Sequence, residues 1–115
     1  MKSPFADLLA SLARQRGVLG SMVVGESDGL IVDSALQVGV KGAVVAALAA
    51  SLYRRARLSA DAAGVGTATF LQLEAERGRL CAVGRNDLVL VALAEPRANV
   101  GMLRIEMLRA LETLA

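Results

Sequence analysis

The 115-residue sequence contains no histidine and a single cysteine, Cys81. Without histidine, the chain has no Ser-His-Asp or Cys-His nucleophile system and no imidazole ligand for zinc. A lone cysteine excludes a four-cysteine zinc site and an internal disulfide, so nothing indicates an oxidising compartment. We therefore expect a protein that is not an enzyme and that has no metal and no cofactor. We expect the Cys81 thiol to be buried in a strand.

Aromatic residues and net charge are also scarce. There is no tryptophan, and only Phe5, Phe70 and Tyr53 are available to stack on nucleic-acid bases. Thirteen basic residues face eleven acidic ones, and the resulting net charge of +2 produces only a weak field. These two features argue against a nucleic-acid partner.

Long apolar runs and phosphate-binding loops are missing as well. The uncharged stretch from Gly42 to Tyr53 is well short of the ~18 apolar residues that a membrane helix needs. Asp7 interrupts the start of the sequence before a signal-like apolar segment develops. The pair Gly64 and Gly66 has no third glycine and precedes a predicted strand, unlike a dinucleotide-binding loop. We expect a cytoplasmic protein that does not insert into membranes.

Apolar aliphatic residues, by contrast, are abundant. Hydrophobic residues make up 55% of the chain, and few of them are aromatic. The length fits one ordinary domain, so we predict a single domain over residues 1–115. An apolar excess in a small domain predicts that more than one face has to be covered, and a second protein surface is one way to cover it.

The first part of the sequence predicts a helix followed by a hairpin. Ser3, which precedes a proline, is the predicted N-cap, and Gly17 is the predicted left-handed C-terminal residue. Residues 18–25 are apolar in both alternating positions, as in a strand that is covered on both faces. A turn at Asp28-Gly29 then leads into a second strand over 30–35.

A long middle helix is predicted over residues 41–58. Its first half is apolar nearly all round, and Val44, Leu48 and Leu52 recur along one stripe. A helix of this kind is buried on two sides. Because the chain has no further elements to cover the second side, we expect the protein to dimerise.

The second half of this helix is strongly basic. Arg54, Arg55 and Arg57 lie within four positions of one another. They form either a solvated helix face or a docking patch, since arginine is enriched at protein interfaces.

The last part of the sequence predicts a three-stranded meander and a final helix. The strands are expected at 67–76, 79–83 and 88–94, and the unbroken apolar run of the third indicates a central strand. Asn99 is the expected N-cap of a helix over 100–114.

These features together resemble the roadblock family of dynein light chains, and bacterial members of the MglB type in particular. The likeness extends over nearly the whole chain and rests on the order and spacing of several short motifs. They are Gly17-Val18-Leu19-Gly20-Ser21, Asp28-Gly29-Leu30-Ile31, Leu73-Glu74 through Gly78 to Leu80, and Asn99-Val100-Gly101 with Arg104. The resemblance implies an α/β fold with the order α-β-β-α-β-β-β-α. The five-stranded antiparallel sheet would have the first and last helices on one face and the middle helix on the other.

The resemblance also implies a function. Roadblock domains usually pair through the middle helix and the third strand, and bacterial members are often partners of small Ras-like GTPases. It therefore implies a homodimeric regulator or scaffold for such a GTPase. A small-ligand sensor or a structural adaptor subunit without a GTPase partner is the alternative. The expected dimer contacts are Val44, Leu48, Leu52, Phe70 and Leu73, and the expected GTPase contacts are Arg54, Arg55 and Arg57.

Overall fold

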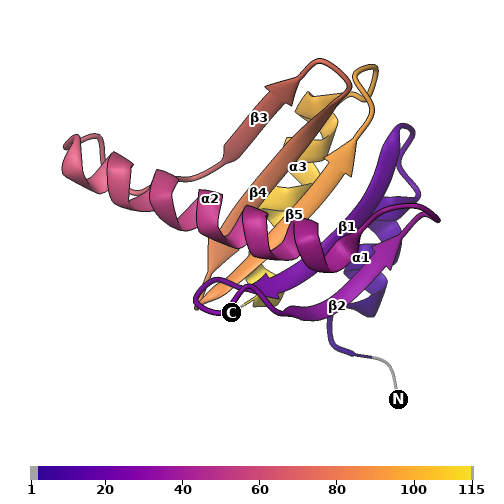
Figure 1. Cartoon of the computed structure of the whole chain (residues 1–115), viewed down its shortest axis with the longest axis horizontal. Helices are drawn as coiled ribbons and strands as arrows, with labels where there is room; N and C mark the ends of the chain where they lie inside the picture. The colour runs from indigo at the N-terminus through magenta and orange to yellow at the C-terminus, as the bar shows by residue number, and fades with distance from the viewer. Residues whose placement is uncertain (1–2, 115) are drawn as a thin grey trace.

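The computed structural model describes residues 3–114 and contains one five-stranded antiparallel sheet with helices on both faces (Figure 1). Residues 1, 2 and 115 of the predicted domain lie outside this description. The elements are α1 (Ala6–Ala13), β1 (Val18–Gly25), β2 (Ile31–Leu36), α2 (Gly42–Ala62), β3 (Leu71–Ala75), β4 (Gly78–Arg85), β5 (Leu88–Ala94), α3 (Val100–Ala110) and a final 3-10 turn, Leu111–Leu114. The fold class and the element order that the resemblance implied are confirmed.

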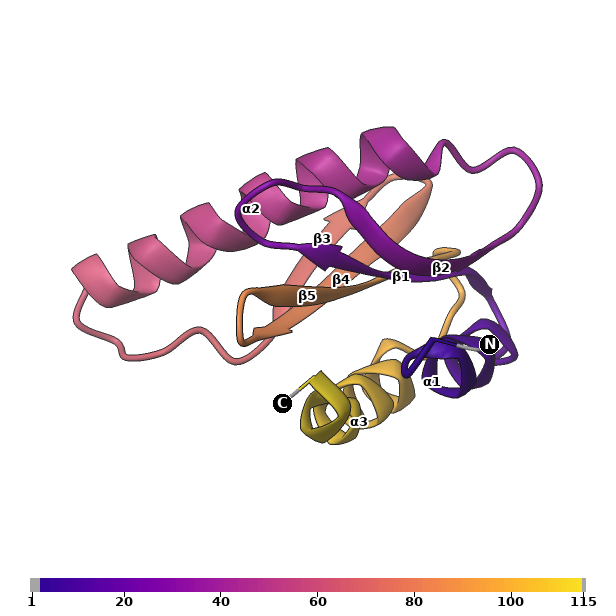
Figure 2. The same ribbon diagram turned by 90° about the horizontal axis from the view of Figure 1, so that it is seen from below.

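The strands lie in the order β2-β1-β5-β4-β3, so β5 is the central strand, as its unbroken apolar run predicted. Figure 2 shows α2 on one face of the sheet and α1 with α3 on the other. The two faces therefore have separate hydrophobic cores. Strands β1 and β5 contribute to both of them, which explains why their residues are apolar in both alternating positions.

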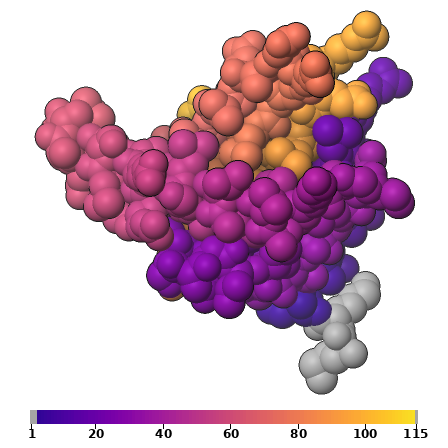
Figure 3. Space-filling model, in the orientation of Figure 1, coloured from indigo at the N-terminus to yellow at the C-terminus, as the bar shows by residue number. Residues whose placement is uncertain are grey.

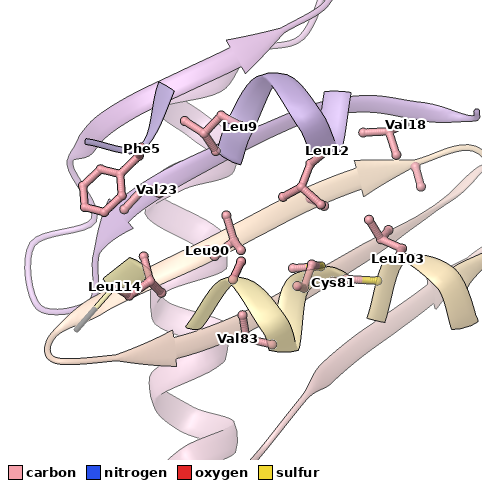
Figure 4. Close-up of a cluster of buried hydrophobic side chains, with 14 residues drawn as sticks. Phe5, Leu9, Leu12, Val18, Val23, Cys81, Val83, Leu90, Leu103 and Leu114 are labelled. Atoms are coloured by element: carbon pink, nitrogen blue, oxygen red, sulfur yellow. The ribbon is translucent and has the colours of Figure 1, made fainter. Parts of the chain in front are cut away.

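The core beneath α1 and α3 consists mainly of large aliphatic side chains. Leu9 and Leu12 from α1, Leu103 from α3 and Leu90 of β5 lie in one cluster of buried side chains (Figure 4). Cys81 of β4 is buried in the same cluster, and burial raises the pKa of its thiol. It is the structural thiol that the sequence predicted.

The core beneath α2 is built from small side chains. Ala46, Ala49 and Ala50 face the sheet and let the helix approach it closely, and Tyr53 fills the next turn. The Tyr53 hydroxyl donates to the Gly84 carbonyl oxygen at 3.5 Å. A Cβ atom on Gly84 would lie 2.5 Å from the Tyr53 ring, so the ring occupies the space that a side chain would need.

Both predicted ends of the first helix are wrong. The helix begins at Ala6 with Phe5 at the N-cap position, and the Ser3 hydroxyl, one turn earlier, accepts the Phe5 N–H at 3.1 Å and donates to Asp33. It ends at Ala13, and Gly17 instead shapes the entry into β1. Gly17 does have a positive φ of 86°, and its carbonyl accepts the Glu95 N–H at 2.7 Å.

The connection between α2 and β3 also differs from the prediction. The helix continues to Ala62 because nothing before Gly64, where φ is 73°, breaks it. Its last turns extend past the edge of the sheet, and residues 67–70 return the chain to the sheet instead of pairing within it (Figure 1). The third predicted strand is therefore shortened to Leu71–Ala75.

The other boundaries shift less. The second strand lies one residue later than predicted, at Ile31–Leu36. Strand β4 extends over Gly78–Arg85 because every residue from Arg79 to Arg85 pairs with β5. Strand β5 has the predicted bounds, and Asn99 caps α3 by accepting the Met102 N–H at 3.0 Å. The final helix becomes 3-10 after Ala110.

Candidate interaction surface

The outer side of α2 is an uncovered apolar stripe. We define the α2 stripe as Val44, Leu48 and Leu52, which recur every fourth residue on the side of the helix opposite Ala46, Ala49 and Ala50. Val44 is 55% exposed and Leu48 is 66% exposed, whereas Leu52 is half-buried. Figure 3 shows α2 as a raised band across this face of the molecule, with its C-terminal end extending beyond the sheet. The stripe has no cover within the described chain.

A second apolar area lies on the same face of the sheet, beside α2. Leu19, Leu73, Leu80 and Leu93 line a cavity of about 310 Å³ at the end of the sheet that holds the β3–β4 turn. We call these four residues the leucine row, because Leu73 pairs in register with Leu80 and Leu80 with Leu93. Leu80 also packs against the core beneath α2, which places the row on the α2 side.

The adjoining sheet edge is open. Strand β3 pairs with β4 on one side and has no strand on its other side among residues 3–114. Its backbone N–H and C=O groups there are available to a further strand. We take the α2 stripe, the leucine row and this edge together as the candidate interaction surface.

The structure brings together four of the five residues that were predicted as dimer contacts. Val44, Leu48 and Leu52 lie on the α2 stripe, and Leu73 belongs to the leucine row. Phe70 is elsewhere, because residues alternate between the two faces along this segment. It packs against the core beneath α1 and α3, where the Arg104 guanidinium lies 5.5 Å from its ring centroid. The Phe70 side chain thus lies on the opposite face of the sheet from Leu73.

The three arginines of α2 do not form one free patch. Arg57 donates from Nε and Nη2 to Oε1 of Glu26, at 3.0 and 2.5 Å, and this hydrogen bond raises the pKa of Arg57. Arg54 donates from Nη1 to the backbone carbonyl of Glu26 at 3.1 Å. Only Arg55 lies beside the stripe, in a hollow of about 320 Å³ that Leu48, Ser51 and Leu52 also line.

Of the leucine row, the sequence predicted only Leu73. Its members come from four strands, and only the pairing register aligns them. The available signal was the position of Leu80 and Leu93 in two strands that were correctly identified. Their mutual register, however, depends on turn geometry and tertiary packing.

The described residues hold no arrangement suited to metal chemistry. Among residues 3–114, no three histidine, cysteine or carboxylate side chains cluster as they would around a metal ion. Within the same range, no helix has both the length and the apolar character to cross a membrane.

Comparison with known proteins gives consistent results. A family model described as Roadblock/LC7 domain matches residues 4–94. The uncharacterised protein MJ1340 of Methanocaldococcus jannaschii is 36% identical over 107 residues, 93% of each chain. The structure of a Roadblock/LC7 domain from Streptomyces avermitilis is similar at a TM-score of 0.83 and 22% identity, covering 93% of this chain and 91% of that one. The gliding protein MglB from Thermus thermophilus gives 0.84 and 18%, covering 100% and 90%. At these identities, the structural similarity shows a shared fold.

Proposed function

The chain belongs to the Roadblock/LC7 domain family, and from this premise we propose that it is a homodimeric regulator or scaffold that binds a small Ras-like GTPase. The observation that carries the proposal is the uncovered α2 stripe, in particular Leu48 at 66% exposure. An exposed apolar helix face and an open strand edge are each typical of a surface that another protein covers.

A second copy of this chain fits that surface. Two β3 edges could pair and extend the sheet across both molecules. Since α2 extends past β3 (Figure 1), this pairing would bring the end of each helix over the exposed sheet face of the other copy. The leucine row and the stripe would then be covered together. Their burial would contribute roughly 25 cal/mol for each Å² of apolar surface removed from water.

For the GTPase, we propose docking on the α2 side of the dimer. Arg55 contributes directly, because it lies at the margin of the stripe and makes no ion pair within residues 3–114. Arg54 and Arg57 contribute through the turn that they position at Glu26. Arginine favours carboxylates through its forked geometry, and charge complementarity mainly speeds and orients association.

The test has two steps. Light scattering of the parent protein at low micromolar concentration should give the mass of a dimer, and a stable monomer would contradict the first half of the proposal. Isothermal titration against a Ras-like GTPase from the same genome, loaded with a GTP analogue, then measures docking. We expect Arg55→Ala to weaken binding by about threefold to tenfold, most strongly at low salt.

The matched control is Arg85→Ala, which removes the same charge from an exposed position in β4. It should bind as the parent does. Equal affinity of Arg55→Ala and the parent across a salt titration would place docking on another face. No binding by the parent would reject the GTPase and favour an adaptor role.

A further inference from the structure

Three connections of the fold meet at one end of the sheet. They are residues 14–17 between α1 and β1, the β3–β4 turn at residues 76–77, and residues 95–99 between β5 and α3 (Figure 1). The Glu95 N–H donates to the Gly17 carbonyl at 2.7 Å, and Arg79 pairs in register with Ala94. We call this the basic end, for the charges that these connections hold.

Arginine dominates this end of the molecule. The three connections and the first residues of β4 contain five arginines and two glutamates. The arginines are Arg14, Arg16, Arg77, Arg79 and Arg97, and the glutamates are Glu76 and Glu95. The turns at the opposite end of the sheet, 26–30 and 86–87, contain Glu26, Asp28 and Asp87. Arg54 and Arg57 of α2 also reach that opposite end, where they bond to Glu26, and Arg85 ends β4 there.

A pocket of about 380 Å³ opens at the basic end, in the layer of α1 and α3. Its floor is apolar and consists of Val18 and Leu103, which are buried. Met102 forms an exposed wall. Arg16 and Arg97 stand at the rim, and both are exposed. The combination of an apolar floor with a few charged groups is typical of sites that bind a specific ligand.

The two rim arginines have no role in the fold that the structure shows. Within residues 3–114, neither Arg16 nor Arg97 makes an ion pair, whereas Arg57, Arg79 and Arg109 each pair with a glutamate. Their guanidinium groups are therefore available to an anion from outside the chain.

We propose that this pocket binds an acidic segment of a partner protein. One apolar side chain of the segment lies on Val18 and Leu103, and flanking carboxylates pair with Arg16 and Arg97. Arginine presents two parallel N–H groups that match a carboxylate. No aromatic residue lines the pocket to stack a base, which favours a peptide over a nucleic acid. Because the pocket lies across the sheet from α2, it can be occupied whether or not the chain dimerises.

The experiment uses fluorescence anisotropy with a labelled nine-residue peptide in which one central leucine is flanked on both sides by glutamates. The parent protein should bind it with an affinity that falls as salt rises. The double variant Arg16→Ala/Arg97→Ala should bind about tenfold more weakly, since two exposed ion pairs are lost. A second peptide with serine in place of the leucine should also bind more weakly, because it cannot cover the apolar floor.

The matched control is Arg85→Ala/Arg109→Ala, which removes two charges elsewhere and should bind as the parent does. Circular dichroism confirms that each variant is folded. The proposal is overturned if the parent does not bind the peptide, if both double variants lose affinity equally, or if the serine peptide binds as well as the leucine peptide. Binding of the parent to phosphatidylglycerol vesicles but not to the peptide would also overturn it, in favour of a membrane surface.

Discussion

Glu26 lies in the turn after β1 and joins three parts of the chain. Its carboxylate accepts from Arg57, its backbone carbonyl accepts from Arg54, and its N–H donates to the Asp87 carbonyl at 2.9 Å. The turn after β1, the middle of α2 and the β4–β5 turn are therefore fixed to one another by a single residue. The Glu26 side chain is only 12% exposed, so water does not readily replace a lost partner.

This arrangement predicts that two arginines of α2, two residues apart, differ in their effect on stability. Arg57→Ala should lower the urea midpoint of unfolding, because it leaves the Glu26 carboxylate without its ion pair. Arg55→Ala should leave the midpoint unchanged. Circular dichroism during urea titration measures both. Equal midpoints for the two variants would show that the contact with Glu26 does not stabilise the fold.

Two buried groups predict a loss of stability at alkaline pH. Burial raises the pKa of Cys81 above its ordinary value of 9.0 and that of Tyr53 above 10.0. The unfolded chain releases these protons at lower pH than the folded chain does. Stability is therefore complete below about pH 9 and falls as the pH rises through 10 and beyond. Urea titrations at pH 7 and at about pH 10.5 should show the loss.

The double variant Tyr53→Phe/Cys81→Ala is the control for this prediction. It lacks both titrating groups, so its stability should fall less between the two pH values than that of the parent. An equal fall in both proteins would assign the alkaline loss to other groups.

At the scale of helices and strands, the features that the sequence predicted correctly are local. The bounds of β5 follow from an unbroken apolar run, and the start of α3 follows from the cap at Asn99. The features that were wrong depend on distant parts of the chain. The shortened β3 reflects where α2 ends relative to the sheet. No local pattern in the sequence indicates that end point.

The cap of α3 allows a quantitative prediction. Asn99→Ala removes the acceptor for the Met102 N–H and should lower the free energy of unfolding by about 1 kcal/mol. Asn99→Ser supplies another oxygen at the same position and should recover most of that loss. Urea denaturation of the three proteins measures the difference. An unchanged stability for Asn99→Ala would mean that water satisfies the N–H equally well.

For α2, the prediction concerns association rather than folding. Leu48 is 66% exposed in the chain, so Leu48→Asp should leave each copy folded while placing an unpaired charge in the proposed dimer contact. Light scattering should show a monomer with parental circular dichroism. Val38→Asp, at a fully exposed position outside α2, is the matched control and should remain a dimer. A dimer for Leu48→Asp would show that the stripe is not the contact.

For the molecule as a whole, association and stability should be linked. If the folded chain dimerises, raising the protein concentration should raise the melting temperature, because only folded copies bind each other. We expect a rise of a few degrees over about a hundredfold range for the parent and none for Leu48→Asp. Differential scanning fluorimetry measures both. A melting temperature independent of concentration for the parent would contradict dimerisation.

The two proposed surfaces lie in opposite layers of the molecule. The α2 stripe and the leucine row face one way, and the pocket between Arg16 and Arg97 lies beneath the other face, beside α3. A dimer formed through α2 would leave two such pockets uncovered. Under the two proposals together, the chain would hold a second copy on one face and an acidic segment on the other without competition between them.

The order of the strands also has a consequence for how the chain folds. Strands β1 and β2 form one local hairpin, and β3, β4 and β5 form a separate meander. Only the pairing of β1 with β5, from Val18 with Ala94 to Gly25 with Leu88, joins them. Pairing of β1 with β5 closes the longest loop in the sheet. The chain loses conformational entropy when this loop closes, before the contacts between the two strands have formed. Substitutions along the β1–β5 seam should therefore slow refolding, whereas those in the outer turns should mainly speed unfolding.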